Sequence, residues 1–435
     1  MNRNLVVGLG VVAVLLLAAA HHRFGAAWVH SHAHGLDQPH AHAASAAVTA
    51  RAMELLDAGE VEEALVLLED AHIHDAAALL PVLRRVQSLR PVAPTTNASD
   101  NSNTHAAAAH PEDPIRLGSG RHTYEWVSGW GTLPEGVVYG NTHGAIVQSA
   151  NGEVLLNTDS AHAVMVFTTA GKFVRSFAKD FAGGAHGMVL VNEKAPAEDT
   201  GVAVAATLGA SIEVLYIAHL GRHEVAKCLL DGTVLTTFAW PEASGHYQRK
   251  EQFNPTSVAV APDGTVFVAD GYGLSWVHRY DAKGKWLSCF GGRGAEPGQM
   301  QTPHGLLLDT RTQPPTLLVA DRENHRLQRF DFEGKLLKVI SGDLRRPCKM
   351  SVHGTDLAVA DLAGRVTILD SADKLVTHLG DQPLPERRAN NGVPRADWRD
   401  GEFIAPHGLA FDRDGNLYIM DWLALGRITK LQRVK

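Results

Sequence analysis

Three histidines stand at the same position of a recurring sequence pattern. They are His186, His304 and His407, and each precedes a glycine and a short apolar run. Neutral imidazole nitrogens suit Zn²⁺, which needs only three protein ligands when a fourth position stays open for water or substrate. Imidazoles at equivalent repeat positions converge only if the repeats close into a ring. The pattern therefore predicts a metal site on the axis of a closed repeat structure.

The repeat that carries these histidines occurs in six copies. The equivalent positions are separated by 43, 70, 48, 44 and 59 residues and are occupied by His143, His186, Thr256, His304, Cys348 and His407. A second strand follows in each copy, at residues 153–159, 214–219, 266–270, 317–321, 357–361 and 417–421. Third and fourth strands are typified by residues 326–330 and 336–340. Four short strands per unit, repeated about every 40 to 50 residues, predict an all-β, six-bladed β-propeller over residues 119–435.

The last copy contains only three strands, ending with residues 427–435. Residues 124–130 precede the first copy and have the pattern of a fourth strand. We expect them to form the outermost strand of the blade that contains His407. Such a strand would close the ring and leave few exposed sheet edges.

Six blades place neighbouring blades about 60° apart, so blades two, four and six, which carry His186, His304 and His407, lie about 120° apart. His143 has the same position in blade one. It could bind the metal, act as a base or line the channel, and we expect the last. Cys348 has this position in blade five and could face the channel, but we expect a buried residue at a strand start.

Five motifs between residues 270 and 324 resemble, in order and approximate spacing, the peptidyl-α-hydroxyglycine α-amidating lyases, which are six-bladed propellers of the NHL-repeat class. The motifs are Asp270-Gly271-Tyr272, Phe290-Gly291-Gly292, Pro297-Gly298-Gln299, Pro303-His304-Gly305 and Ala320-Asp321-Arg322-Glu323-Asn324. The resemblance covers roughly residues 120–435 as architecture, and it is specific over about 255–330 and around His407.

The resemblance implies a zinc-dependent lyase that cleaves the N–C bond of a carbinolamide to give a peptide amide and glyoxylate. The family's zinc ligands match His186, His304 and His407, its catalytic tyrosine matches Tyr272, and one arginine matches Arg322. A phenol titrates near 10 and becomes a useful base only beside positive charge. We therefore expect Arg322, on the blade next to Tyr272, to lower the pKa of the phenol and to grip a substrate carboxylate or carbonyl.

The chain departs from the family's pattern at four places. Ala405 replaces a methionine, and Gly408 replaces a calcium-binding aspartate, which argues against a structural calcium. Gly273 replaces a cysteine, so the associated disulfide is absent. The family's further catalytic arginine in blade one has no match, because Arg121 is near but out of register.

Composition narrows the function classes. A net charge of −7 and the lack of a Lys/Arg-rich run argue against nucleic-acid binding. The three cysteines form neither a metal-type pair nor a disulfide framework. The alternative to a lyase acting on a peptide or small molecule is a non-enzymatic NHL propeller that binds a protein or peptide. A calcium-dependent lactonase-like propeller is disfavoured, because Ca²⁺ prefers carboxylates and amides to histidine.

The first 118 residues are expected to place the propeller outside the cytoplasm. Arg3 and the apolar run to Ala20 predict a signal peptide cleaved near Ala20 or, as we prefer, a retained signal anchor in the membrane over residues 1–20. Residues 21–45, with seven histidines between His21 and His42, predict a flexible tether, or else a loose metal-binding tract. Apolar periodicity over 46–91 predicts a helical hairpin. A Pro-, Asn- and Ser-rich linker over 92–118 is expected to join it to the propeller.

Overall fold

The computed structural model describes residues 50, 51, 54, 114–194 and 211–434. The chain divides into two compact units, residues 1–110 and 111–435. In the first unit, Ala50, Arg51 and Glu54 are helical and exposed. The expected membrane segment, the tether, the rest of the hairpin and most of the linker lie outside the described residues. Among the residues described, no helix combines the length and apolar character needed to cross a membrane.

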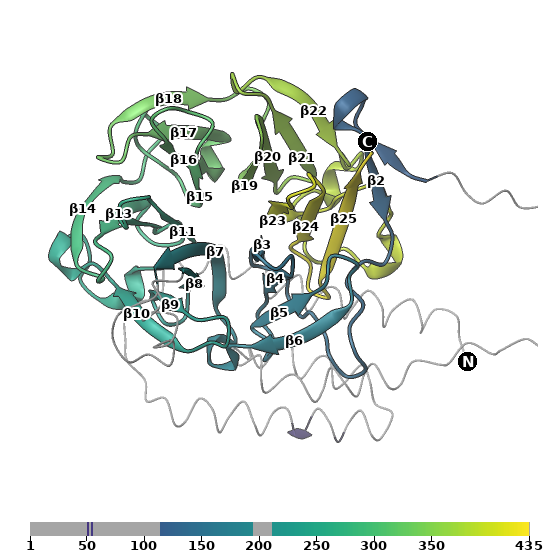
Figure 1. Ribbon diagram of the computed structural model, residues 1–435, viewed down its shortest axis with the longest axis horizontal. Coiled ribbons are helices and arrows are strands. Elements are labelled where there is room, and N and C mark those ends of the chain that lie inside the picture. Colours follow the sequence, from purple (N-terminus) through teal and green to yellow (C-terminus); the bar gives the residue numbers. More distant parts are fainter. Residues whose placement is uncertain (1–49, 52–53, 55–113, 195–210, 435) are drawn as a thin grey trace, which may run out of the picture. The chain divides into compact units, whose positions relative to one another are not determined.

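The second unit contains six antiparallel sheets arranged as blades around a central axis (Figure 1). Blades one to three comprise β3 Ile146–Gln148, β4 Val154–Asn157, β5 Val164–Phe167 and β6 Phe173–Phe177; β7 Ala185–Lys194, β8 Ser211–His219, β9 Glu224–Cys228 and β10 Val234–Ala239; and β11 Ser257–Val260, β12 Val266–Ala269, β13 Trp276–Tyr280 and β14 Trp286–Gly291. Blades four and five comprise β15 Pro303–Asp309, β16 Thr316–Asp321, β17 Arg326–Phe330 and β18 Leu336–Ile340; and β19 Pro347–His353, β20 Asp356–Asp361, β21 Arg365–Leu369 and β22 Leu375–Leu379. The predicted six-bladed propeller is confirmed.

Blade six joins the two ends of the propeller. Its strands are β23 Pro406–Phe411, β24 Leu417–Asp421, β25 Arg427–Arg433, β2 Tyr124–Val127 and β1 Arg116–Leu117. β2 pairs with β25, with Tyr124 opposite Arg433, so the predicted closing strand is confirmed. The expectation that this strand is outermost was wrong. β1 pairs with the free edge of β2, placing Arg116 opposite Glu125, because an unpaired edge leaves backbone groups open for a further strand.

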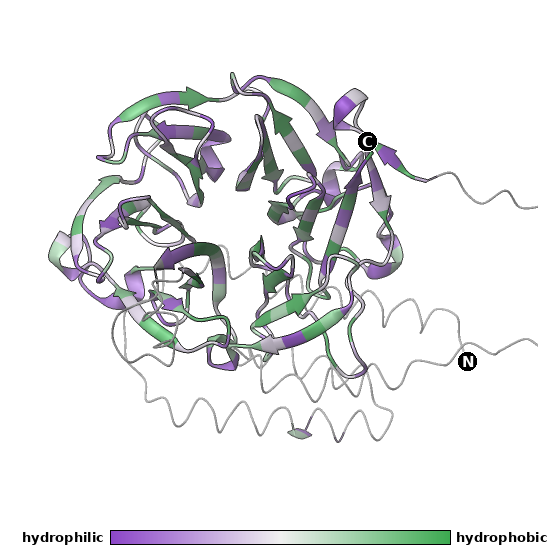
Figure 2. Ribbon diagram, viewed as in Figure 1, coloured by the Kyte–Doolittle hydropathy of each residue, from purple (hydrophilic) through white to green (hydrophobic). Residues whose placement is uncertain are grey.

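Most second strands of the blades are largely apolar (Figure 2). β4, β12, β16 and β20 are buried along their whole length. Short uninterrupted apolar runs of this kind are typical of strands covered on both faces, here by the neighbouring blades. Seven 3₁₀ helices lie in the connections of the described propeller: η1 Gly120–His122, η2 Lys179–Phe181, η3 Glu242–Ser244, η4 Lys250–Gln252, η5 Arg322–Asn324, η6 Pro385–Arg387 and η7 Arg395–Asp397.

Four aspartates after or at the ends of second strands hold the loops that lead into the inner strand of the same blade. One carboxylate oxygen of each accepts a backbone N–H from that loop: Asp270 from Asn254 (2.7 Å), Asp321 from Gln301 (2.7 Å), Asp361 from Arg345 (2.9 Å) and Asp421 from Ala405 (2.8 Å). All four carboxylates are buried. Because these loops end two to three residues before the repeat position that carries the histidines, the aspartates fix where each inner strand begins.

Candidate metal centre

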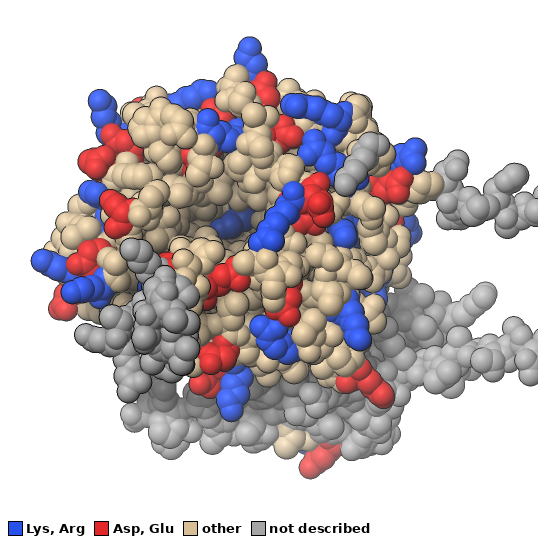
Figure 3. Space-filling view, viewed as in Figure 1, with Lys and Arg blue, Asp and Glu red and all other residues tan. Residues whose placement is uncertain are grey.

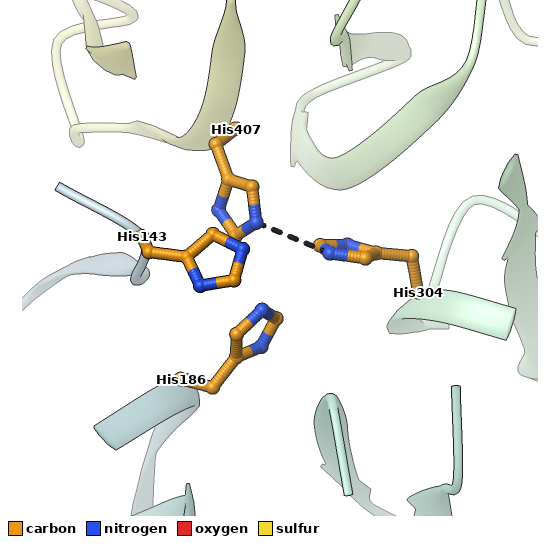
Figure 4. Close-up of side chains that lie close together, drawn as sticks. All are labelled: His143, His186, His304 and His407. Carbon is orange, nitrogen blue, oxygen red and sulfur yellow. Dashed lines mark hydrogen bonds between the residues drawn. The ribbon is translucent and has the colours of Figure 1, made fainter. Parts of the chain in front are cut away.

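Four histidines meet at the centre of the ring: His143, His186, His304 and His407 (Figure 4). One ring nitrogen from each lies within 4.8 Å of the others. The Nε2 atoms of His304 and His407 are 3.1 Å apart. The structure thus brings together the three histidines predicted from the sequence and adds His143, which we expected only to line the channel.

A local irregularity lies at each predicted ligand, and β19 has the same irregularity at Cys348. β7, β15 and β23 each shift register against their second strand at the histidine, between Ala185 and Met188, between Pro303 and Gly305, and between Pro406 and Gly408. A bulge of this kind re-aims a side chain that regular alternation would place elsewhere. The histidine side chains therefore leave the sheet and enter the channel.

The next blade anchors each of these three imidazoles. Nδ1 of His186 donates to the carbonyl of Thr256 (2.6 Å), that of His304 to Cys348 (3.2 Å) and that of His407 to Gly144 (3.0 Å). A hydrogen bond that uses Nδ1–H leaves Nε2 with its lone pair, and it also fixes the orientation of the ring. All three side chains consequently present Nε2 as a preset ligand.

The glycine after each histidine allows that anchoring carbonyl to come close. A Cβ on Gly187 would lie 2.3 Å from the Thr256 carbonyl oxygen, one on Gly305 2.1 Å from that of Cys348, and one on Gly408 2.6 Å from that of Gly144. Real Cβ atoms do not approach backbone oxygens so closely, and only glycine fits where a backbone must approach. The repeated His-Gly pair thus combines a ligand with the space for its support.

Burial keeps the three imidazoles neutral. His186, His304 and His407 are 2%, 3% and 2% exposed. Burial lowers the pKa of His186 to about 3, and it holds the pKa of His304 and of His407 well below the usual value. Nε2 of His186 is buried without a hydrogen-bond partner, a costly arrangement unless another group uses the lone pair. Three neutral, oriented nitrogen donors fit Zn²⁺.

Tyr272 and Arg322 lie over the histidines from adjacent blades. Tyr272 follows β12, and Arg322 opens η5 after β16. Arg322 Nη1 donates to the Tyr272 hydroxyl oxygen at 3.1 Å, and that oxygen lies 3.0 Å from His304 Nε2. Glu323 holds Arg322 Nε at 2.8 Å and also pairs with Arg346. The arrangement places a phenol, a guanidinium and the imidazoles around one space.

The pKa of Tyr272 differs from our expectation. Burial raises the pKa of the phenol, and Arg322 lowers it, but the effect of burial is the larger. Arg322 therefore acts in the expected direction without making the metal-free phenol a stronger acid. The sequence indicated the effect of the Arg322 guanidinium on this pKa, but it could not show how completely protein atoms surround the Tyr272 hydroxyl.

Cys348 and Arg121 lie outside the histidine cluster. Cys348 is fully buried and packs with Leu362 and Ile404, and burial raises its pKa to about 11, so the thiol remains protonated. Arg121 lies in η1 and pairs with Asp356 at 3.4 Å.

Lys349 is a channel residue that the sequence analysis missed. It replaces the glycine that follows the repeat histidines, and its Nζ lies 3.5 Å from Ser257 Oγ on blade three. Burial lowers its pKa to about 8. Its positive charge acts on both His186 and His407. Figure 3 shows basic side-chain atoms within the hollow at the centre of the ring.

Comparison with known proteins relates part of the chain to peptide-amidating enzymes. No protein family model matches it. It is 30% identical to mouse peptidyl-glycine alpha-amidating monooxygenase over 184 residues, which are 38% of this chain and 17% of that protein. It is 42% identical over 78 residues to a probable peptidyl-alpha-hydroxyglycine alpha-amidating lyase of Caenorhabditis elegans, covering 18% of this chain and 22% of that protein. A streptogramin B lyase structure aligns with a TM-score of 0.44 and 15% identity, covering 68% of this chain and 94% of that one.

The chain thus resembles the amidating lyases, as the motifs between residues 270 and 324 indicated. It spans about a fifth of the length of the curated relatives named above.

Proposed function

We propose that this protein is a zinc-dependent carbon–nitrogen lyase that converts a peptidyl-α-hydroxyglycine into a peptide amide and glyoxylate. The observation that carries the proposal is the position of the Tyr272–Arg322 pair, 3.1 Å apart, above three buried and anchored imidazoles. The partial similarity to amidating enzymes supports it.

The proposed reaction needs a proton transfer and no oxidant. The α-hydroxyl loses its proton, the carbon–oxygen bond becomes a carbonyl, and the electron pair of the N–C bond goes to the amide nitrogen. That nitrogen gains one proton. Peptide–CO–NH–CH(OH)–COO⁻ therefore yields peptide–CO–NH₂ and OHC–COO⁻ with all atoms accounted for.

His186, His304 and His407 would hold the zinc ion. A bound zinc ion would polarise a substrate oxygen as a Lewis acid, and its positive charge would favour ionisation of a neighbouring phenol.

Tyr272 and Arg322 would act directly on the substrate. In its ionised form, Tyr272 is the proposed acceptor of the hydroxyl proton, and the same oxygen can return that proton to the leaving nitrogen. Glu323 fixes Arg322 at Nε, Nη1 donates to the phenol, and the same guanidinium would bind a substrate carboxylate. Arg322 therefore positions the carboxyl end of the substrate while holding the phenol in place.

We also propose that the propeller acts outside the cytoplasm, carried by the predicted signal anchor or released after signal cleavage. Its partner would be a peptide or small-molecule substrate. The calcium expected in the family has no proposed place here, because Gly408 offers no carboxylate.

The test is glyoxylate release from a synthetic peptidyl-α-hydroxyglycine by zinc-loaded protein. Wild type should release glyoxylate and peptide amide in equal amounts, and Tyr272→Phe should retain zinc but lose at least about 100-fold in rate, the contribution of a general base. The matched control is Tyr139→Phe, a half-buried tyrosine in the loop before β3 whose hydroxyl donates to the Gly131 carbonyl. Zinc-loaded wild type that releases no glyoxylate contradicts the proposal.

A further inference from the structure

We infer that His143 is not a fourth metal ligand but the residue that positions the Tyr272 hydroxyl. This inference rests on the proposed metal site, and it separates two roles within a cluster of four similar side chains. It implies that the metal has three protein ligands and keeps a position open for substrate.

The support of its ring distinguishes His143 from the three predicted ligands. Each predicted ligand has Nδ1 fixed by a carbonyl of the next blade, whereas none of the described residues offers such a carbonyl to Nδ1 of His143. The equivalent carbonyl, that of His186, accepts instead from Asn157 Nδ2 at 2.8 Å. Asn157 Oδ1 accepts the N–H of Ala145, which keeps the amide in this orientation. Blade one therefore lacks the device that presets a ligand.

The surroundings of His143 direct its ring toward Tyr272. Its Nε2 lies 3.0 Å from the Tyr272 hydroxyl oxygen, and its ring is nearly parallel to the Tyr272 ring, with 12° between the planes and 5.9 Å between the centroids. The Trp422 ring lies 5.3 Å from the His143 ring, and the His407 ring 4.5 Å from it. His143 is thus oriented by aromatic neighbours toward the phenol.

The donors and acceptors around the Tyr272 hydroxyl leave one role for His143. Three groups surround its oxygen: Arg322 Nη1 at 3.1 Å, His304 Nε2 at 3.0 Å and His143 Nε2 at 3.0 Å. Arg322 can only donate, so the phenolic hydrogen must go to one of the two imidazoles. Once His304 Nε2 serves as a ligand, its lone pair is no longer free. In the neutral phenol, before it ionises to act as the base, His143 is then the acceptor that holds the phenolic hydrogen.

This assignment gives His143 and Arg322 complementary roles. Arg322 fixes one lone pair of the phenol, and His143 fixes the direction of its hydrogen, which leaves the remaining lone pair directed to the space above the histidines. A hydroxyl without the second contact can rotate, because a phenolic hydrogen is held only by its acceptor. His143 is therefore a positioning residue that acts through Tyr272.

The test compares His143→Ala with His186→Ala in the full-length protein. Zinc affinity is measured by competition with a chelator that removes loosely held metal. His143→Ala should keep one tightly bound zinc with affinity within about threefold of wild type. His186→Ala should lose far more zinc affinity than the roughly 10- to 100-fold that is typical when a residue contacting a metal ligand is removed. The Co²⁺-substituted forms should show the same visible spectrum for His143→Ala as for wild type.

The second readout is the NMR resonance of the Tyr272 ring carbon that bears the hydroxyl. The chain has seven tyrosines, so this resonance is assigned as the one that disappears in Tyr272→Phe. It should move in His143→Ala but not in His162→Ala, a control histidine of blade one that bonds Ser176. His143→Gln, which can still accept a hydrogen bond, should restore part of the shift and supplies the same test if the alanine variant does not fold. In turnover, His143→Ala should lower kcat by about 10- to 100-fold with little change in KM.

Two results would overturn the inference. One is loss of zinc from His143→Ala to the extent seen in His186→Ala, which would make His143 a ligand. The other is an unchanged Tyr272 resonance in a zinc-retaining variant. Neither readout requires lyase turnover, so absence of glyoxylate from wild type would refute the proposed function and leave the role of His143 to be decided by metal affinity and NMR.

Discussion

Acid should destabilise the metal-free protein through its buried histidines, and His186 allows the effect to be calculated. Its pKa is about 3 in the folded protein, because burial disfavours the charged imidazole, and about 6.5 in an unfolded chain. Between these values the unfolded state binds a proton that the folded state does not. Stability is therefore complete well above pH 6.5 and falls as the pH is lowered toward 3.

The expected magnitude is about 2 kcal/mol from His186 alone between pH 7 and pH 5. Asp270, whose folded pKa is raised to about 7 by burial, opposes this trend, because its folded form binds a proton first as the pH falls. A comparison of variants removes that contribution. In chelated His186→Gln, the free energy of unfolding should fall by about 2 kcal/mol less between pH 7 and pH 5 than in chelated wild type.

Urea unfolding followed by tryptophan fluorescence measures this difference, since seven of the eight tryptophans lie after residue 120. His162→Gln is the control, because its imidazole bonds Ser176 away from the cluster, and it should follow the wild-type dependence more closely. Equal pH dependence in His186→Gln and wild type would refute the reasoning, since it would mean that His186 is accessible to protons in the folded state.

Three further predictions concern the supports of the site. Gly305→Ala should destabilise the propeller by about 1 to 3 kcal/mol and weaken zinc binding, because its Cβ would lie 2.1 Å from the Cys348 carbonyl oxygen. Gly221→Ala is the control in urea and chelator titrations, because its Cβ would have no neighbour closer than 3.6 Å. Equal effects of the two substitutions would contradict the proposed anchoring of His304 by that carbonyl. Lys349→Met should raise zinc affinity by about fivefold, since a nearby unit charge costs a divalent cation on the order of 1 kcal/mol even at a high effective dielectric constant. Unchanged or weaker binding in a chelator competition would contradict this. Arg322→Lys should raise KM and lower kcat together, because an ammonium cannot replace the fork that contacts Glu323 and Tyr272, whereas wild-type kinetics in a glyoxylate assay would show that Arg322 has neither role.

The sequence predicted the architecture because each blade repeats the same local pattern. The strands over 326–330, 336–340 and 417–421 match β17, β18 and β24, since apolar runs and glycine turns fix short antiparallel strands locally. β1 was missed because a two-residue strand has no periodicity. Its formation depends on the free edge of β2, which is created only when the ring closes.

The cluster was predictable in part for the same reason. Equivalent repeat positions lie at equivalent places around the axis, so the convergence of His186, His304 and His407 could be predicted. The distinct position of His143 was not visible, because the His143-Gly144 pair looks like the others. The difference is that Asn157 donates to the His186 carbonyl, at the position where the other three rings have their anchoring carbonyl. This contact joins two blades and cannot be predicted from a local sequence pattern. The net pKa of Tyr272 likewise depends on surrounding atoms contributed by several blades.

The most direct test of the central claim is a zinc titration of the chelated full-length protein, with glyoxylate release measured at each step. The zinc that His186→Ala still binds is subtracted as background, because it would include any metal held by the histidine-rich residues 21–45. The account predicts that activity toward a peptidyl-α-hydroxyglycine rises with zinc and saturates at one equivalent above that background, and that His186→Ala stays inactive throughout. Activity that is independent of zinc, or one tightly bound zinc without glyoxylate release, would contradict it.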